Sequence, residues 1–172
     1  MVANALGGLQ EFEGSRVARS MERLPWVDKV GAHFALYKVP GWASFPWGIS
    51  ACLRSLGLPA RLVWPSSRER LVRGLRDETV NIVIVGDLLC FKGMMYKGWA
   101  HAKVLYGYQP PAPTGSTLTP VLRPGWYFVD PAVPPDSSGE LPAGLSWQDE
   151  EGFSRQWGNL LRCSIEIRKG SC

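Results

Sequence analysis

The sequence is poor in the residues that build metal sites. Its 172 residues include only 4 Cys and 2 His, and no two cysteines have the close spacing of zinc ligands. With only His33 and His101 to complete a ligand set, we expect neither a metal ion nor a cofactor. The cysteines are expected to be reduced thiols, and Cys52, in an apolar stretch, is predicted to lie in the core.

Long hydrophobic runs and strong charge are also missing. No apolar run approaches the roughly 18–20 residues that cross a bilayer, and residues 1–14 lack the features of a secretory signal. We therefore expect a soluble, cytoplasmic protein without membrane contact. The net charge is only +4, with no basic tail or recognition module, so a nucleic-acid partner is not expected. Nothing in the sequence indicates the oligomeric state.

Glycine and proline are plentiful, at 19 and 14 residues, and divide the hydrophobic pattern into short segments. Apolar residues at helical spacing predict helices over residues 9–24, 44–56, 66–77 and 147–161. Ser66 or Ser67 is expected to cap the third helix and Ser146 the fourth. Short apolar or alternating runs predict strands over residues 33–39, 60–64, 80–85, 102–108 and 126–129. The segments 109–125 and 130–144 are predicted to be loops.

This order of elements is typical of an α+β domain, with an N-terminal helix packed on a mostly antiparallel sheet. A hydrophobic fraction of 45% is sufficient for a core. We expect residues 1–30 to form a helical extension and residues 31–172 to form the main domain.

Three segments carry candidate chemistry. Ser44 begins the predicted helix SFPWGISACLRSLG, His101 begins the strand HAKVLYGY, and Asp130 follows the strand GWYFV. A nucleophile at a helix N-terminus gains from the helix dipole and from backbone N–H groups that can hold an oxyanion. A histidine at a strand edge can accept the proton of the nucleophile, and a neighbouring carboxylate can fix its tautomer.

The segments HAKVLYGY, WYFVDPA and GFSRQW together resemble the double-glycine leader peptidases, the bacteriocin-processing cysteine peptidases of the papain-like superfamily. This resemblance implies a papain-like domain over residues 31–172. It also implies that His101 is the general base and Asp130 its orienting partner.

In that family the nucleophilic cysteine begins the helix that ends in Leu-Gly. Counting back from Leu56-Gly57 aligns Pro46 with the motif proline and Ser44 with the cysteine, while Phe45 replaces a glycine. The glutamine that completes the oxyanion hole in the family has no counterpart between residues 36 and 43.

A second resemblance involves the same region. LRSLGLPARLV, followed by HA and GWYFVDP, is similar to transglutaminase-like proteins. In that register Trp42 occupies the position of the cysteine.

The sequence predicts an acyl-transfer site, in which Ser44 attacks a peptide or acyl carbonyl, His101 moves the proton and Asp130 orients the ring. Hydrolysis and amide formation share this first step. Ser44 is alternatively a helix cap, or a serine that has replaced a cysteine. The other function that remains open is a catalytically inactive papain-like module that binds a peptide or a carrier-protein segment.

Overall fold

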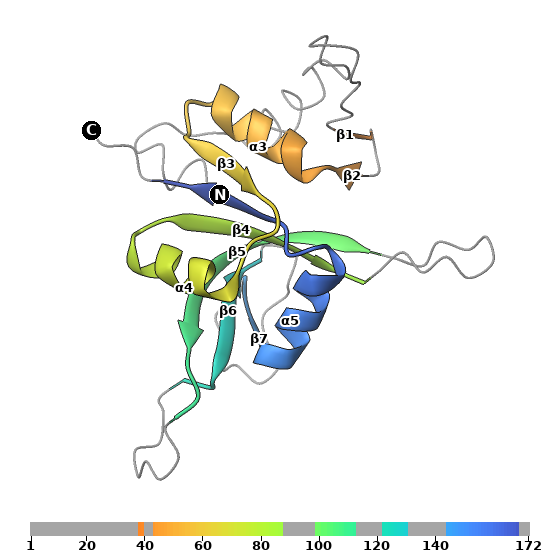
Figure 1. Cartoon of the computed structure of the whole chain (residues 1–172). Coiled ribbons are helices and arrows are strands. Elements are labelled where there is room, and N and C mark those ends of the chain that lie inside the picture. The colour runs from red at the N-terminus through yellow and green to blue at the C-terminus, as the bar shows by residue number, and fades with distance from the viewer. Residues whose placement is uncertain (1–37, 40–42, 88–98, 113–121, 131–143, 169–172) are drawn as a thin grey trace, which may run out of the picture. The chain divides into compact units, whose positions relative to one another are not determined.

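The computed structural model describes residues 38–39, 43–87, 99–112, 122–130 and 144–168 (Figure 1). The predicted helix over residues 9–24, the extension over residues 1–30 and most of the predicted strand over residues 33–39 lie outside these ranges. The chain divides into two compact units, the first formed by residues 1–63 with 165–172 and the second by residues 64–164. Each unit is described by itself.

In its described residues, the first unit contains one helix and short strands. β1 (Lys38–Val39) and β2 (Ala43–Ser44) form an antiparallel pair. They are followed by α3 (Pro46–Ser55) and β3 (Ala60–Val63), and β3 lies beside β8 (Ser164–Ile167), which is in this unit from Ile165 onward. Cys52 is 2% exposed, which confirms its prediction as a core residue.

The start of α3 differs from the prediction in one respect. The helix begins at Pro46 with Phe45 as its N-cap, and no side chain caps it. Ser44 lies one residue earlier, in β2, where it pairs with Lys38. The prediction that Ser44 is a helix cap is therefore wrong. The proline explains this start, because its fixed φ suits the first helical position and its missing N–H needs no cap.

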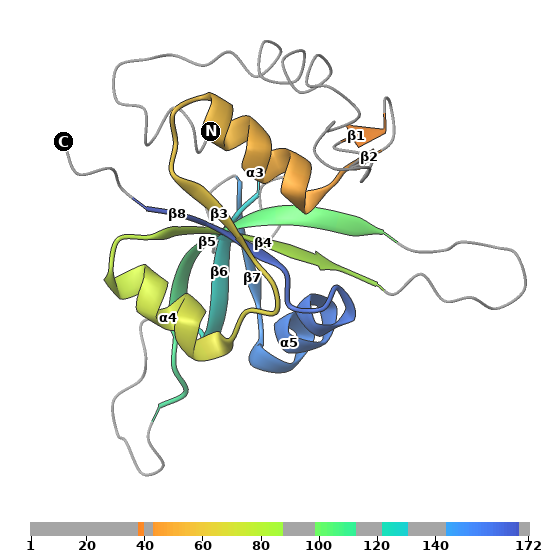
Figure 2. The same cartoon turned by 45° about the horizontal axis from the view of Figure 1, so that its top comes forward.

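Among its described residues, the second unit contains a four-stranded antiparallel arrangement and two helices. Its strands β4 (Val80–Gly86), β5 (Ala100–Gln109), β6 (Gly125–Val129) and β7 (Leu145–Gln148) pair in chain order. α4 (Arg68–Arg76) precedes the strands, and α5 (Glu150–Asn159) follows them (Figure 2). The fold is α+β with antiparallel pairing, as predicted.

The core of the second unit lies between the two helices and one face of these strands. Leu71 from α4 and Phe153 and Trp157 from α5 contact side chains of three strands. The strand members of this cluster are Val83, Val85, Leu105, Trp126 and Phe128. The rings of Phe153 and Trp157 stack with their centroids 5.3 Å apart. Burial of each large side chain in this cluster stabilises the unit by about 1.5–3 kcal/mol.

The helix starts in this unit test the predicted caps. Ser67 caps α4, and its Oγ accepts a hydrogen bond from the Arg70 backbone N–H at 3.2 Å, as one of the two predicted serines should. Asp149 caps α5 through a 2.6 Å bond from Gly152 N–H. The prediction of Ser146 as that cap is wrong, because Ser146 lies in β7 and pairs with Phe128.

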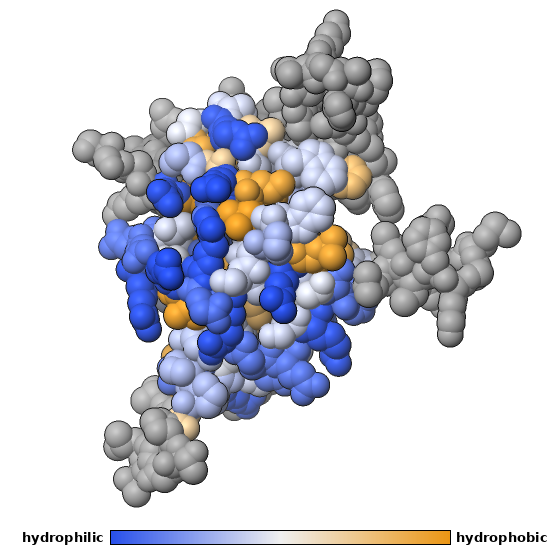
Figure 3. Space-filling model, in the orientation of Figure 1, coloured by the Kyte–Doolittle hydropathy of each residue, from blue (hydrophilic) through white to orange (hydrophobic). Residues whose placement is uncertain are grey.

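The two ends of the second unit meet. The Ser66 backbone N–H donates to the Arg162 carbonyl oxygen at 2.9 Å, close to the points where the chain enters at residue 64 and leaves at residue 164. On the face seen in Figure 3, the region of α4 is mostly hydrophilic, as its sequence RERLVRGLR suggests. Within the described ranges, no helix has both the length and the apolar character of a membrane span.

Candidate active site

A histidine and a buried carboxylate form a close pair in the second unit. The Nε2 atom of His101 lies 2.9 Å from Oδ1 of Asp130. The side chain of Asp130 is 3% exposed, whereas that of His101 is 36% exposed. The carboxylate is therefore shielded from water while part of the imidazole ring remains open to an approaching molecule.

The register of β5 and β6 brings the two residues together. Val104 pairs with Val129 and Leu105 with Phe128. If this register is continued by one residue, Asp130 faces Lys103 and is a diagonal neighbour of His101. Such diagonal pairs lie within reach of longer side chains. The Asp130 backbone is held as well, because its N–H donates to the Gly144 carbonyl oxygen at 2.7 Å.

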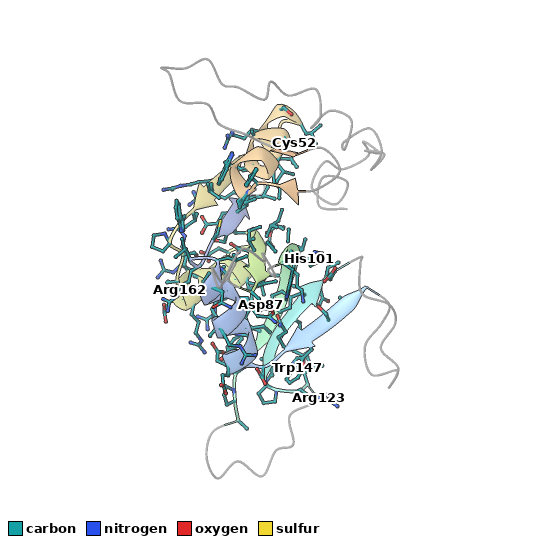
Figure 4. The ribbon with its side chains drawn as sticks, turned by 90° about the vertical axis from the view of Figure 1, so that its right-hand side faces the viewer. Cys52, Asp87, His101, Arg123, Trp147 and Arg162 are labelled. Carbon is teal, nitrogen blue, oxygen red and sulfur yellow. The ribbon has the colours of Figure 1, made fainter. Side chains whose placement is uncertain are left out.

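These side chains share a face of the sheet with the core. His101 pairs with Val85, which belongs to the buried cluster, and paired residues project from the same face. The pair thus lies at the edge of a packed core, which restricts its motion. Figure 4 shows His101 at one end of the unit, with Arg123 and Trp147 at the opposite end.

The geometry determines which ring nitrogen can act as a base. An ionised carboxylate only accepts hydrogen bonds, so the nitrogen that faces it must carry the proton. Nε2–H of His101 therefore donates to Asp130, and in the neutral ring the lone pair is on Nδ1. A proton acceptor on one side and a carboxylate on the other is the arrangement that general-base catalysis requires.

The structure adds a residue that the sequence analysis did not select. Nζ of Lys103 lies 3.8 Å from Oδ2 of Asp130, and the lysine side chain is only 11% exposed. Burial lowers the pKa of Lys103, and the negative charge of Asp130 acts in the opposite direction. The available signal was the period-two alternation of β5, which places Lys103 on the same face as His101 and Leu105.

Ser44 and the pair belong to different units. Ser44 is in the first unit, directly before the N-cap of α3, and His101 and Asp130 are in the second. The structure brings His101 and Asp130 into contact, and the three-residue catalytic site remains a prediction. The first backbone N–H groups of α3 belong to Trp47 and Gly48, because Pro46 has none.

An aromatic side chain lies next to the pair in sequence. Trp99, two residues before His101, is 44% exposed. Its Nε1–H donates to Oδ2 of Asp87 at 2.7 Å, and its carbonyl oxygen accepts from the Asp87 backbone N–H at 3.1 Å. Asp87 therefore holds both the ring and the backbone of an exposed tryptophan at the start of β5.

The remaining described candidates do not form a reactive site. Cys52 and Cys163 are buried and form no disulfide, and burial raises the pKa of Cys163 to about 11. A thiol of that kind is a poor nucleophile at neutral pH. In the part of the chain that the structure describes, no three His, Cys, Asp or Glu side chains group as a metal site requires. Cys90 and His33 lie outside that part.

Comparison with known proteins finds similarity among solved structures alone. No protein-family model matches the chain, and no curated protein sequence matches it. Among solved structures, the chain is similar to one titled "Crystal structure of an putative C39-like peptidase from Bacillus anthracis". The two are 13% identical with a TM-score of 0.49, and the match covers 81% of this chain and 66% of that one. A likeness of this extent does not establish an activity, a substrate or a partner.

Proposed function

We propose that the chain is an acyl-transfer enzyme of the cysteine-peptidase type that acts on a peptide or acyl substrate, with Ser44 at the nucleophile position. The observation that carries the proposal is the His101–Asp130 pair, with Nε2 bonded to a buried carboxylate and the ring partly exposed. A purely structural histidine has no need of an exposed ring edge. A proton transfer would use Nδ1, the ring nitrogen that does not face Asp130.

In the proposed reaction the Ser44 hydroxyl oxygen attacks the substrate carbonyl carbon. Nδ1 of His101 accepts the hydroxyl proton as the C–O bond forms, and Asp130 stabilises the resulting imidazolium. The tetrahedral oxyanion is held by backbone N–H groups at the start of α3. His101 then gives its proton to the leaving group, which departs and leaves an acyl-serine ester. Water hydrolyses this ester, or an amine attacks it to form a new amide.

Serine makes this reaction dependent on the histidine. A serine hydroxyl has no accessible anionic form near neutral pH and needs a base to accept its proton. A cysteine at the same position would ionise more readily beside a helix start and a histidine. The proposal therefore predicts a stronger nucleophile in Ser44→Cys than in the unaltered chain.

The test is covalent labelling followed by intact-protein and peptide mass spectrometry. A fluorophosphonate is used on the unaltered chain and iodoacetamide on Ser44→Cys, each with and without His101→Ala. We expect modification at position 44 that requires His101. Iodoacetamide should modify Ser44→Cys about tenfold faster than an ordinary thiol at pH 7, because the thiolate fraction is larger.

A matched control separates the effect of the helix start from that of the histidine. Ser67 caps α4, so Ser67→Cys places a thiol at another helix N-terminus. Its labelling rate should not change with His101→Ala, whereas that of Ser44→Cys should fall. Equal rates for the two thiols, both insensitive to His101, would contradict the proposed site.

One observation favours the second candidate, a catalytically inactive module that binds a peptide or carrier-protein segment. Phe45 and Trp47, which flank the start of α3, stack with ring centroids 4.8 Å apart, and Trp47 is 40% exposed. Stacked, exposed aromatic rings offer a contact for extended peptides. A peptide library selected on the chain and counter-selected on Trp47→Ala tests this function. Peptides whose binding depends on Trp47, in a chain that the probes do not label at position 44, would favour the binding module.

A further inference from the structure

Lys103 is a buried cation in contact with the carboxylate of the candidate site. Its side chain is 11% exposed, and Nζ lies 3.8 Å from Oδ2 of Asp130 and 5.5 Å from the centre of the Phe128 ring. Lysine is among the residues least often buried, because removing its charge from water is costly without a partner. A lysine kept in this position therefore calls for an explanation beyond core packing.

The two oxygens of Asp130 face different nitrogen-bearing side chains. Oδ1 faces His101 at 2.9 Å, and Oδ2 faces Lys103 at 3.8 Å. A carboxylate with one partner can rotate about its terminal bond and exchange its oxygens. With a second partner fixed on the other oxygen, rotation would break the pairing with Lys103, so the carboxylate plane is defined.

The position of Lys103 follows from the sheet. It pairs with Val83 in β4, and the continued register of β5 and β6 sets it opposite Asp130. Its aliphatic stem can therefore pack among buried residues while the ammonium group reaches the end of β6. The backbone of β5 fixes the Cα end of Lys103, and the Asp130 carboxylate fixes its ammonium end.

We propose that Lys103 is a positioning residue, which holds Asp130 through Oδ2 so that Oδ1 orients the imidazole of His101. This inference rests on the proposed function, because orientation of the ring matters only if the ring transfers a proton. Lys103 does not touch the reacting atoms and acts only through Asp130. Its ammonium group also places a positive charge beside the buried carboxylate that accepts the Nε2–H bond.

The test observes the ring directly and needs no substrate. Nitrogen NMR of histidine-labelled chain distinguishes Nε2–H from Nδ1–H tautomers, and the spectrum of His33→Gln assigns the signals of His101. We expect the unaltered chain to hold the Nε2–H tautomer. In Lys103→Met, the ring should lose this single tautomer, and its Nε2–H proton should exchange with water about tenfold faster, since one charged contact on Asp130 is lost.

Two further variants separate positioning from packing. Lys103→Arg keeps the charge and should retain the Nε2–H tautomer, whereas Lys103→Gln, which is polar but neutral, should behave as Lys103→Met does. Arg61→Met removes an exposed positive charge from β3 and should leave the ring unchanged. An unchanged His101 tautomer and exchange rate in folded Lys103→Met or Lys103→Gln would overturn the inference.

A reciprocal measurement covers the case in which neither neutral variant folds. In lysine-labelled chain, Asp130→Asn should shift the Nζ resonance of Lys103 and leave those of the other lysines in place. No shift at Lys103 would also overturn the inference. Because these readouts do not involve turnover, failure of the positioning role is distinguishable from failure of labelling at position 44.

Discussion

Asp130 and His101 are joined diagonally across two strands, with Oδ1 and Nε2 2.9 Å apart, although the register of the strands sets Asp130 opposite Lys103. The carboxylate thus contacts both His101 and Lys103, which are successive residues on one face of β5. The geometry gives His101 a fixed orientation with Nδ1 as the remaining ring nitrogen. It makes Asp130 the residue whose replacement should most directly alter the ring.

Asp130→Asn tests the orientation of the histidine. An amide can donate as well as accept, so it no longer requires a proton on Nε2, and the ring can adopt the opposite tautomer. We expect histidine-dependent labelling at position 44 to fall by about tenfold to 10⁴-fold. Labelling rates measured beside thermal unfolding curves check this. An unchanged rate in folded Asp130→Asn would mean that the carboxylate has no part in the chemistry.

The start of α5 gives a prediction with an internal contrast. Asp149→Ala removes the bond from Gly152 N–H and should lower the free energy of unfolding by about 1 kcal/mol. Ser146→Ala should cost much less or stabilise the chain, because the Ser146 hydroxyl oxygen is buried without a hydrogen-bond partner. Urea unfolding of both variants measures the difference. A larger loss of stability in Ser146→Ala than in Asp149→Ala would indicate that Ser146 is the cap after all.

Two glycines provide a second matched pair. Gly125 has φ of 141°, and an added Cβ would lie 2.4 Å from the Gln148 carbonyl oxygen. Gly125→Ala should therefore destabilise the chain by about 1–3 kcal/mol. Gly158 lies in α5 with open space around it, so Gly158→Ala should stabilise by about 0.5–1 kcal/mol. Denaturant midpoints report both changes, and equal effects would contradict the β6–β7 geometry.

Cys163 gives a prediction about alkaline pH. Burial raises its pKa from 9.0 to about 11, so the folded chain keeps the thiol proton that the unfolded chain loses above about pH 9. The stability associated with the protonated thiol is complete below pH 9 and is lost as the pH rises through 11.

The free energy of unfolding should consequently fall more steeply between pH 9 and pH 11 in the unaltered chain than in Cys163→Ala. Comparing the two chains cancels the contributions of the other titrating groups. Parallel pH profiles would show that the Cys163 thiol is as accessible to water in the folded chain as in the unfolded one.

Local sequence signals predicted most of the described elements. The strand VNIVIV, the strand around Leu105 and the helix capped by Ser67 were all predicted because hydrophobic period and capping residues agree there. β7 was missed, since LSWQ has only four residues and its strand form depends on pairing with β6. The four-residue strand β8, SIEI, was missed too.

The candidate site was predictable in part for a similar reason. His101 and Asp130 could be selected because each lies at a strand end beside recognisable neighbours. Their 2.9 Å contact depends on register, which the sequence does not state. Lys103 was overlooked because a lysine in a strand usually indicates a solvent-exposed position. Its burial is indicated only by the alternation of side chains along β5, which places Lys103 on the same face as Leu105, and by the packing seen in the structure.

The bond from Ser66 N–H to the Arg162 carbonyl oxygen has a topological consequence. The bond joins two residues near the ends of the second unit, residues 64–164, so those ends lie close together. An element with adjacent ends can be inserted into another chain or rejoined end to end with little loss of conformational freedom. The segment that contains His101, Lys103 and Asp130 is therefore a natural unit for transplantation and circular permutation.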